Sequence, residues 1–233
     1  LAQLRSSHPK HRRFYHPAES ALAMDRQSLA ARIDHTVLGP LTTPADARAA
    51  AETAATAGMH LCVPPRTLEA VPAGFPGELV TVIGFPHGTD TTATKVAAAE
   101  AAALVGADII DLVPDLGAAV AGDDARLRAA IAAVTDAVAL LVRVIAETGL
   151  CPPAAVDRIG TAAVAAGAAG LKTSTGYGGG GATVPAVRQL AAYMPVKASG
   201  GIRSYDDAMR LLNAGATRPG ASAGPALVAD APG

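Results

Sequence analysis

The sequence predicts an α/β protein, a closed (β/α)8 TIM barrel, on three observations. Short β-branched or apolar runs alternate with Ala-rich stretches of helical spacing throughout residues 24–233. This pair of elements recurs eight times at about 26 residues a unit, which is enough for a short strand, a three-turn helix and two loops. A doubly wound open sheet would carry a glycine fingerprint after its first strand, whereas here that strand continues into HTVLGPLTTP.

Each unit has recognisable boundaries. We expect strands at residues 32–37, 59–63, 79–84, 108–112, 139–145, 170–172, 195–198 and 216–219. We expect helices at residues 44–57, 65–71, 92–105, 123–137, 153–166, 185–193, 204–213 and 224–229. Pro44, Pro153 and Pro185 fall in first turns, where the missing N–H costs no intrahelical bond. Lys95 lies near the start of the third helix, and we expect its side chain to be solvated.

Residues 1–23 differ from the rest of the chain. They hold basic residues and three of the six histidines, without helical or strand periodicity. They also lack the apolar core or the amphipathic Arg/Ser helix of a targeting segment. We therefore expect residues 1–23 to be a disordered leader, with Met24 as the natural start and a single barrel domain over residues 24–233.

The composition excludes several classes of partner. Lys and Arg number 19 against 20 Asp and Glu, so no basic field favours nucleic acid or an anionic membrane. Uncharged apolar stretches fall short of the roughly 18 residues that a membrane-spanning helix needs. Cys62 and Cys151 lie far apart without a CxxC motif, which argues against a disulfide framework or a structural zinc and favours the cytoplasm.

Three predicted strands end with a charge that a barrel interior does not tolerate without a partner: Asp111 in IIDLV, Lys172 in GLKTSTG and Lys197 in VKASGG. A buried charge is costly unless paired, so an ion pair between Asp111 and one lysine is one interpretation. Lysines on neighbouring strands, about 4.8 Å apart, favour a second interpretation, because each ammonium lowers the pKa of the other. A lysine that is neutral near pH 7 can form a Schiff base with a carbonyl.

Gly-rich segments follow the last three predicted strands, at residues 173–183, 199–204 and 219–224. Glycine lets backbone N–H groups approach an oxyanion, and the loops after strands seven and eight commonly bind phosphate in this fold. For any one of these segments, the alternative to phosphate binding is that its glycines only form a turn. Arg203 is the only cation that we expect near these loops, and the net charge of −1 gives no positive field around them. We therefore expect backbone and hydroxyl donors, and not a basic cluster, to hold the phosphate.

Seven motifs occur in one order: IDHTVL (33–38), LCVPP (61–65), VIGFPHG (82–88), GADIIDLV (106–113), VIAETGL (144–150), LKTSTGYGGGGAT (171–183) and VKASGGIRSYDDA (196–208). With these motifs, the chain resembles the deoxyribose-phosphate aldolase family over about residues 25–229. The resemblance implies a class I aldolase, without metal or other cofactor. Such an enzyme reversibly cleaves 2-deoxy-D-ribose 5-phosphate to acetaldehyde and D-glyceraldehyde 3-phosphate in deoxyribonucleotide catabolism.

The resemblance also implies roles for individual residues. The Schiff-base lysine matches Lys172, the second lysine, which lowers its pKa, matches Lys197, and the acid/base aspartate matches Asp111. Two polar positions at the mouth of the first strand, which bond to the substrate or the proton relay, match Asp34 and Thr36. The phosphate contacts match Gly176, Ser199, Gly200, Gly201, Gly220 and Ser222.

Three positions leave questions open. Cys62 matches a residue lining the pocket, although a plain core cysteine is the alternative. Arg143 stands where the family commonly has lysine, so a proton-releasing role there would be lost while charge support for Asp111 survives. Pro219 removes a donor from the eighth strand and is expected to loosen it.

Two alternative functions are kept. One is another lysine-dependent barrel aldolase with a different substrate preference. The other is a phospho-sugar-binding barrel without catalysis, which rests on Arg143 and Pro219. The expected partners are small phosphorylated sugars and aldehydes, with neither nucleic acid nor membrane, and the oligomeric state is left open, a homo-oligomer being compatible.

Overall fold

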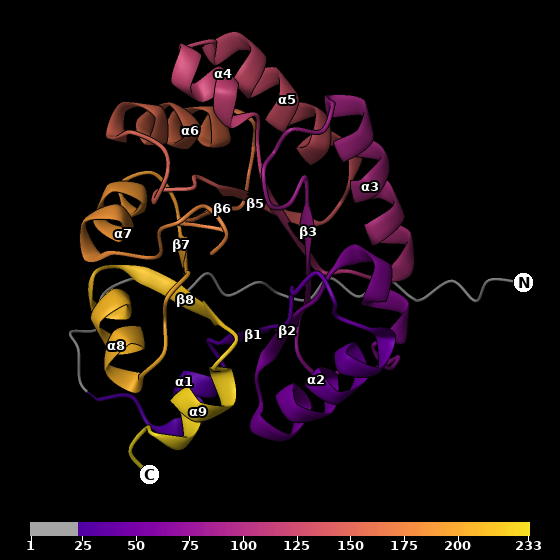
Figure 1. The fold of residues 1–233 in the computed structure, drawn as a ribbon, viewed down its shortest axis with the longest axis vertical. Helices are drawn as coiled ribbons and strands as arrows, with labels where there is room; N and C mark the ends of the chain where they lie inside the picture. The colour runs from indigo at the N-terminus through magenta and orange to yellow at the C-terminus, as the bar shows by residue number, and fades with distance from the viewer. Residues whose placement is uncertain (1–22) are drawn as a thin grey trace, which may run out of the picture.

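The computed structural model describes residues 23–233, which form a closed barrel of eight parallel strands within a ring of helices (Figure 1). The strands follow sequence order, and the last pairs with the first. They are β1 Asp34–Thr36, β2 His60–Cys62, β3 Leu79–Ile83, β4 Ile109–Leu112, β5 Leu141–Ile145, β6 Gly170–Lys172, β7 Val196–Ser199 and β8 Ala216–Ala221. The predicted (β/α)8 barrel is confirmed, and every strand overlaps its predicted segment. The expected leader, except for its last residue, lies outside the described residues.

The helices agree with the sequence except at three places. They are α1 Arg26–Ala30, α2 Pro44–Ala57, α3 Thr92–Val105, α4 Leu116–Ala121, α5 Asp124–Ala137, α6 Pro153–Ala165, α7 Val184–Ala191, α8 Tyr205–Asn213 and α9 Gly224–Ala229. The segment Pro65–Ala70 is a 3-10 helix, η1. Helices α1 and α4 were not expected, because five or six residues are too few for a periodic pattern. Both begin at an aspartate, Asp25 or Asp115, that caps a backbone N–H.

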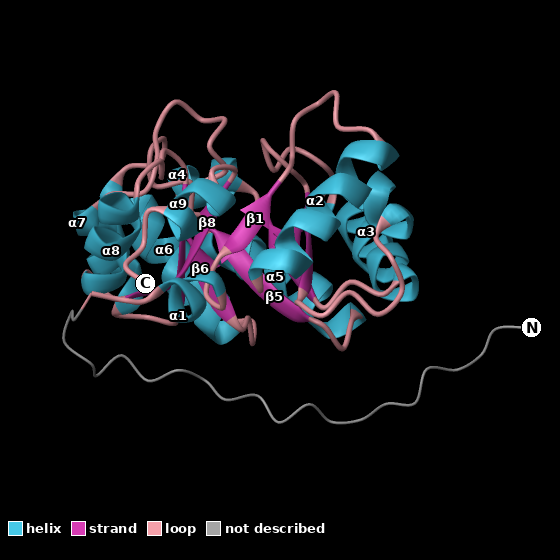
Figure 2. Cartoon of the chain, turned by 90° about the horizontal axis from the view of Figure 1, so that it is seen from below, coloured by secondary structure: helices cyan, strands magenta, loops and turns pink. Residues whose placement is uncertain are grey.

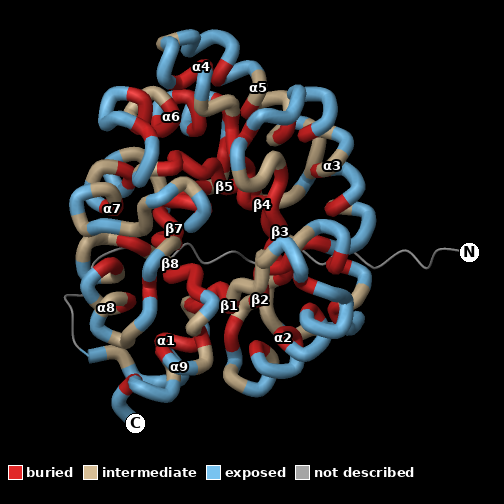
Figure 3. Tube along the Cα trace, in the orientation of Figure 1, coloured by how far each residue is buried: buried red, intermediate tan, exposed pale blue. Residues whose placement is uncertain are grey.

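The core lies between the barrel and its helices, and inside the barrel itself. Figure 2 shows the strands enclosed by helices, and Figure 3 shows that the buried residues concentrate on the strands and on the inward faces of the helices. The five residues of β3 are all buried, as parallel strands covered on both faces require. Helix α2 buries Ala47, Ala50, Ala51 and Ala54, and these short side chains allow it to pack closely. In the same described range, no helix combines the length and apolarity needed to cross a bilayer.

The eighth strand continues through Pro219. Residues on both sides of the proline keep their partners, with Arg218 opposite Lys197 on β7 and Gly220 opposite both Ser199 on β7 and Asp34 on β1. The register shifts once between β7 and β8, near Lys197. The missing N–H of Pro219 therefore does not end the strand.

The expectation that Lys95 is solvated is wrong. Its side chain is 3% exposed, and its Nζ donates a hydrogen bond to the Gly88 carbonyl at 2.7 Å. The stem packs against Gly84, where a Cβ would lie only 2.8 Å from Lys95 Cε and where φ is +66°. Burial lowers the pKa of the Lys95 ammonium, an effect that Asp115 and Asp90 oppose. Lys95 therefore ties the loop after β3 down onto helix α3.

Replacing Lys95 should destabilise the fold. Lys95→Met keeps the stem but leaves the buried Gly88 carbonyl without its donor, so we expect the free energy of unfolding to fall by about 1–3 kcal/mol. Lys95→Ala also removes the packing of the stem and should cost more. Urea unfolding followed by circular dichroism measures both, with Glu100→Ala, an exposed position on the same helix, as the control. If both Lys95 variants were as stable as the control, the bond would not support this loop.

Candidate functional site

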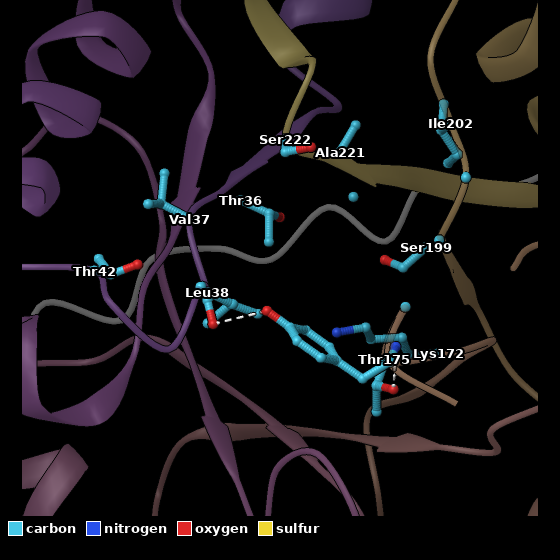
Figure 4. A pocket seen from close by; sticks show the side chains of 16 residues that line it. Thr36, Val37, Leu38, Thr42, Lys172, Thr175, Ser199, Ile202, Ala221 and Ser222 are labelled. Carbon is cyan, nitrogen blue, oxygen red and sulfur yellow. Dashed lines mark hydrogen bonds between the residues drawn. The ribbon is translucent and has the colours of Figure 1, made fainter. Parts of the chain in front are cut away.

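A cavity of about 510 Å³ opens where the carboxyl ends of the strands meet the loops. The loops after β1, β6, β7 and β8 line it, and Figure 4 shows Lys172, Thr36, Ser199 and Ser222 around it. The residues that were predicted for the site and line the cavity are Lys172, Thr36, Gly176, Ser199, Gly200, Gly201, Gly220 and Ser222. The structure therefore brings the expected phosphate loops and the expected nucleophile into one space.

The two lysines and Asp111 meet just below this cavity. Lys172 and Lys197 are direct register partners on β6 and β7, so both side chains enter the barrel at the same level. The Asp111 Oδ2 atom accepts hydrogen bonds from Lys172 Nζ at 3.1 Å and from Lys197 Nζ at 2.9 Å. One carboxylate oxygen thus joins the two amines, and the interpretation of a single Lys–Asp pair is too simple.

Two arginines complete the cluster. Arg143 on β5 donates from Nε to Asp111 Oδ1 at 2.7 Å and from Nη2 to Asp34 Oδ2 at 2.9 Å. Arg218 on β8 binds Asp34 Oδ1 at 2.9 Å and Glu78 at 2.6 Å. Lys197 also contacts Asp34 Oδ2, so each of the two buried aspartates has both oxygens paired. Arg143 therefore keeps the charge support for Asp111 that was expected of it.

Glycines make space for these long side chains. A Cβ on Gly220 would lie 2.5 Å from Lys197 Cε and 2.4 Å from Ser199 Oγ. A Cβ on Gly170 would face Arg143 Cγ at 3.5 Å and the Pro195 carbonyl at 2.9 Å. Gly220 thus has a second role besides facing the cavity, because its missing side chain lets Lys197 reach Asp111.

The charges around Lys172 are balanced without it. Within the described residues, these contacts link three carboxylates (Asp34, Asp111, Glu78) with three cations (Arg143, Lys197, Arg218). A protonated Lys172 would add an excess charge in a side chain that is 2% exposed. Burial lowers the pKa of Lys172, and Lys197 lowers it further, although Asp111 opposes both. The surroundings of Lys172 therefore shift its equilibrium toward the neutral, nucleophilic amine.

The other members of the cluster are held in their charged forms. Burial disfavours the ammonium of Lys197, but Asp111 and Asp34 outweigh it and raise the pKa of Lys197. Burial likewise opposes ionisation of Asp111, but Arg143 and the two lysines hold its pKa well below the usual value. The pKa values of the two lysines thus move in opposite directions, although both are buried.

Two sequence-based expectations need correction. Asp34 does not lie at the mouth of the first strand: it is fully buried below the cavity and contacts Lys197, so it belongs to the ion cluster. Cys62 does not line the cavity and packs against Val80, Val82 and Ile109 in the barrel interior, as the core alternative has it. Arg203 follows the cavity-lining Ile202 but is itself exposed and does not line the cavity.

The sequence analysis missed Arg218 and its neighbours. Arg218 is a charge inside a strand, so the criterion that selected Asp111 and the lysines would also have found it. Glu78 precedes β3 and carried no such signal. His60 Nε2 donates a hydrogen bond to the Ala31 carbonyl and His60 Nδ1 accepts one from the Glu78 N–H. Burial, followed by Arg218, lowers the pKa of His60.

Metal ligands are not grouped in this structure. Over residues 23–233, no set of three or more His, Cys, Asp and Glu side chains is placed to hold a metal ion. The two cysteines, Cys62 and Cys151, are free and buried.

Comparisons with known proteins agree with one family. No protein-family model matches the chain. It is 50% identical over 208 residues to the deoxyribose-phosphate aldolase of Halobacterium salinarum, which covers 88% of this chain and 98% of that protein. It is 45% identical over 210 residues to the deoxyribose-phosphate aldolase of Thermus thermophilus, with coverages of 86% and 96%. The solved tetrameric deoxyribose phosphate aldolase of Aeropyrum pernix matches with a TM-score of 0.81 at 29% identity, over 88% of this chain and 91% of that one. The chain therefore belongs to the deoxyribose-phosphate aldolase family.

Proposed function

We propose that this aldolase cleaves 2-deoxy-D-ribose 5-phosphate through a Schiff base on Lys172, with Asp111 and Lys197 moving the protons. One observation carries the assignment. Lys172 is the lysine whose amine lines the cavity, and the carboxylate that binds this amine also binds Lys197. A buried amine with a lowered pKa, next to a group that exchanges protons with it, meets the requirements for carbonyl attack.

The reaction follows from this arrangement. The Lys172 amine attacks C1 of the open-chain sugar, and loss of one water leaves an iminium. Deprotonation of the C3 hydroxyl breaks the C2–C3 bond, whose electrons pass to the iminium nitrogen as an enamine, and D-glyceraldehyde 3-phosphate leaves. Protonation at C2 and addition of one water release acetaldehyde and restore the amine. Asp111 lies within hydrogen-bond distance of both amines and can pass protons between them.

The phosphate belongs at the other side of the cavity, in the loops after β7 and β8. Gly200 and Gly201 line the cavity and have φ values of 99° and 76°, a conformation that other residues rarely adopt. Ser199 and Ser222 add hydroxyl groups on the same side. Neutral donors therefore bind the anion there, in keeping with the net charge of −1 of the whole chain.

The alternative functions are less well supported. Arg143 does not remove the charge support of Asp111, and Pro219 does not interrupt β8, so the reasons for a non-catalytic barrel lose their weight. The location that fits two free, buried cysteines is the cytoplasm. A homo-oligomer is part of the proposal, supported by the tetrameric relative from Aeropyrum pernix.

Borohydride reduction in the presence of acetaldehyde should trap a two-carbon adduct on Lys172, because the pKa of this amine is lowered and the side chain lines the cavity. Peptide mass spectrometry identifies the modified lysine, and Lys172→Arg is the control. Trapping with acetaldehyde but not with a ketose phosphate also distinguishes this function from that of another lysine-dependent aldolase. An adduct on Lys197 or Lys95 would overturn the assignment.

Lys197→Met should move the activity to higher pH. Removal of one positive charge raises the pKa of Lys172, so the amine stays protonated over a wider range, and each unit lowers the neutral fraction about tenfold. The profile of kcat/KM against pH reports this shift on its acidic limb. Arg188→Met, which removes an exposed charge from α7, is the control. An acidic limb that stays in place would mean that burial activates Lys172 without help from Lys197.

Ser222→Asp should weaken binding of the phosphate by charge repulsion. We expect at least a tenfold rise in KM for 2-deoxy-D-ribose 5-phosphate, with the slow cleavage of unphosphorylated deoxyribose nearly unchanged. Ser222→Ala, which removes the hydroxyl without adding charge, should have a smaller effect. Steady-state kinetics on both sugars measure the difference, and an equal loss on both would show that this loop shapes the catalytic centre itself.

A further inference from the structure

We propose that Tyr177, held against Phe85, closes the cavity beside Lys172 and makes the enzyme select aldehydes over ketones. The inference rests on the proposed role of Lys172 and assigns a specificity-determining role to a residue of the loop between β6 and α7. Tyr177 lines the cavity together with Lys172, although its side chain has no part in the chemistry described above.

Tyr177 connects two loops that the barrel separates. Its hydroxyl donates a hydrogen bond to the Leu38 carbonyl at 3.1 Å, the bond drawn at Leu38 in Figure 4. Leu38 follows β1 and Tyr177 follows β6, and the strands β7 and β8 lie between these two in the barrel. The tyrosine therefore spans part of the cavity mouth from one loop to the other.

The ring of Tyr177 meets that of Phe85 beside the reactive amine. The two centroids lie 5.4 Å apart with an interplanar angle of 83°, an edge-to-face contact. The Nζ atom of Lys172 lies 5.6 Å from the centroid of the Phe85 ring. Phe85 follows β3, which is opposite β7 in the closed barrel, so the Phe85 end of the aromatic pair lies across the barrel from the loop after β7.

The position of Tyr177 is fixed before any substrate binds. Its backbone N–H donates to Thr175 Oγ1 at 3.0 Å, and the Thr175 N–H donates to both oxygens of Glu147 at 3.2 and 3.1 Å. Glu147 is 1% exposed and has a φ of 46°, an unfavourable conformation for a residue with a side chain. A buried carboxylate in a strained conformation thus holds the loop that carries Tyr177.

This placement determines what can be attached to the carbonyl carbon. The substrate extends from Lys172 toward the phosphate loops through C2, so the remaining substituent of C1 faces away from them, toward the aromatic pair. An aldehyde has a hydrogen atom there, whereas a ketone has at least a methyl group. In this proposal a methyl group meets the aromatic pair, whose Tyr177 ring is held by Leu38 at its hydroxyl and by Thr175 at its backbone. Exclusion of one methyl by a packed site typically gives about 10–200-fold discrimination.

The test compares two donors in the synthetic direction, with D-glyceraldehyde 3-phosphate as the acceptor. We expect Tyr177→Leu, which removes the ring contact, to raise the ratio of kcat/KM for acetone over acetaldehyde at least tenfold. Tyr177→Phe keeps the ring but loses the bond to Leu38, so its ratio should rise less. Tyr193→Phe is the matched control, because it deletes a phenolic hydroxyl that bonds to Asp157 on α6, outside the cavity.

Borohydride trapping of acetaldehyde on each variant separates the proposed role of Tyr177 in donor selection from the proposed Schiff base on Lys172. If Lys172 is trapped and the acetone-to-acetaldehyde ratio of kcat/KM rises, the role of Tyr177 in donor selection is supported. If Lys172 is trapped but Tyr177→Leu leaves this ratio unchanged, or lowers kcat/KM for both donors in proportion, the inference about Tyr177 fails while the Schiff-base assignment stands. If the wild-type enzyme forms no adduct at Lys172, the proposed function fails first.

Discussion

The structure depends on the Asp111 carboxylate, which is fully buried and shared by two lysines and an arginine. Burial alone would favour the neutral acid, but the positive charges of Arg143 and Lys197 hold the pKa of Asp111 well below its usual value. Lys197 contacts both aspartates, which raise its pKa, whereas Lys172 shares a single carboxylate with it. The same buried interior therefore shifts the pKa values of the two lysines in opposite directions, and the downward shift at Lys172 is the one that Schiff-base chemistry needs.

The barrel interior holds an apolar cluster beside the charged one. The apolar cluster comes from β2, β3 and β4 and includes Cys62, Val80 and Ile109. The charged side chains come from β1, β4, β5, β6, β7 and β8. Gly170 and Gly220 leave space for the long stems, so two interior glycines are as necessary to the site as the charged groups. Each aspartate oxygen has a cationic partner, as a buried ion cluster requires.

Much of the fold and the centre of the site could be predicted from local sequence. Asp111, Lys172 and Lys197 stand out because a charge inside an apolar strand needs a reason. Arg218 meets the same criterion, but ATRPG is also compatible with a surface turn. The burial of Lys95 has no local signal, since the loop that covers it folds back from β3. The ring of Tyr177 could not be placed either, because a Gly-rich loop has no periodicity that fixes where its side chains lie.

The balance of charge also connects the two ends of the cavity. The iminium adds one positive charge to a network that is otherwise balanced, at a nitrogen that is 2% exposed in the free enzyme. In the proposed reaction the substrate phosphate brings negative charge into the same cavity. A cationic phosphate site would cancel that charge locally. The glycines and serines proposed to bind the phosphate are neutral, so its charge would stay free to stabilise the iminium across the cavity.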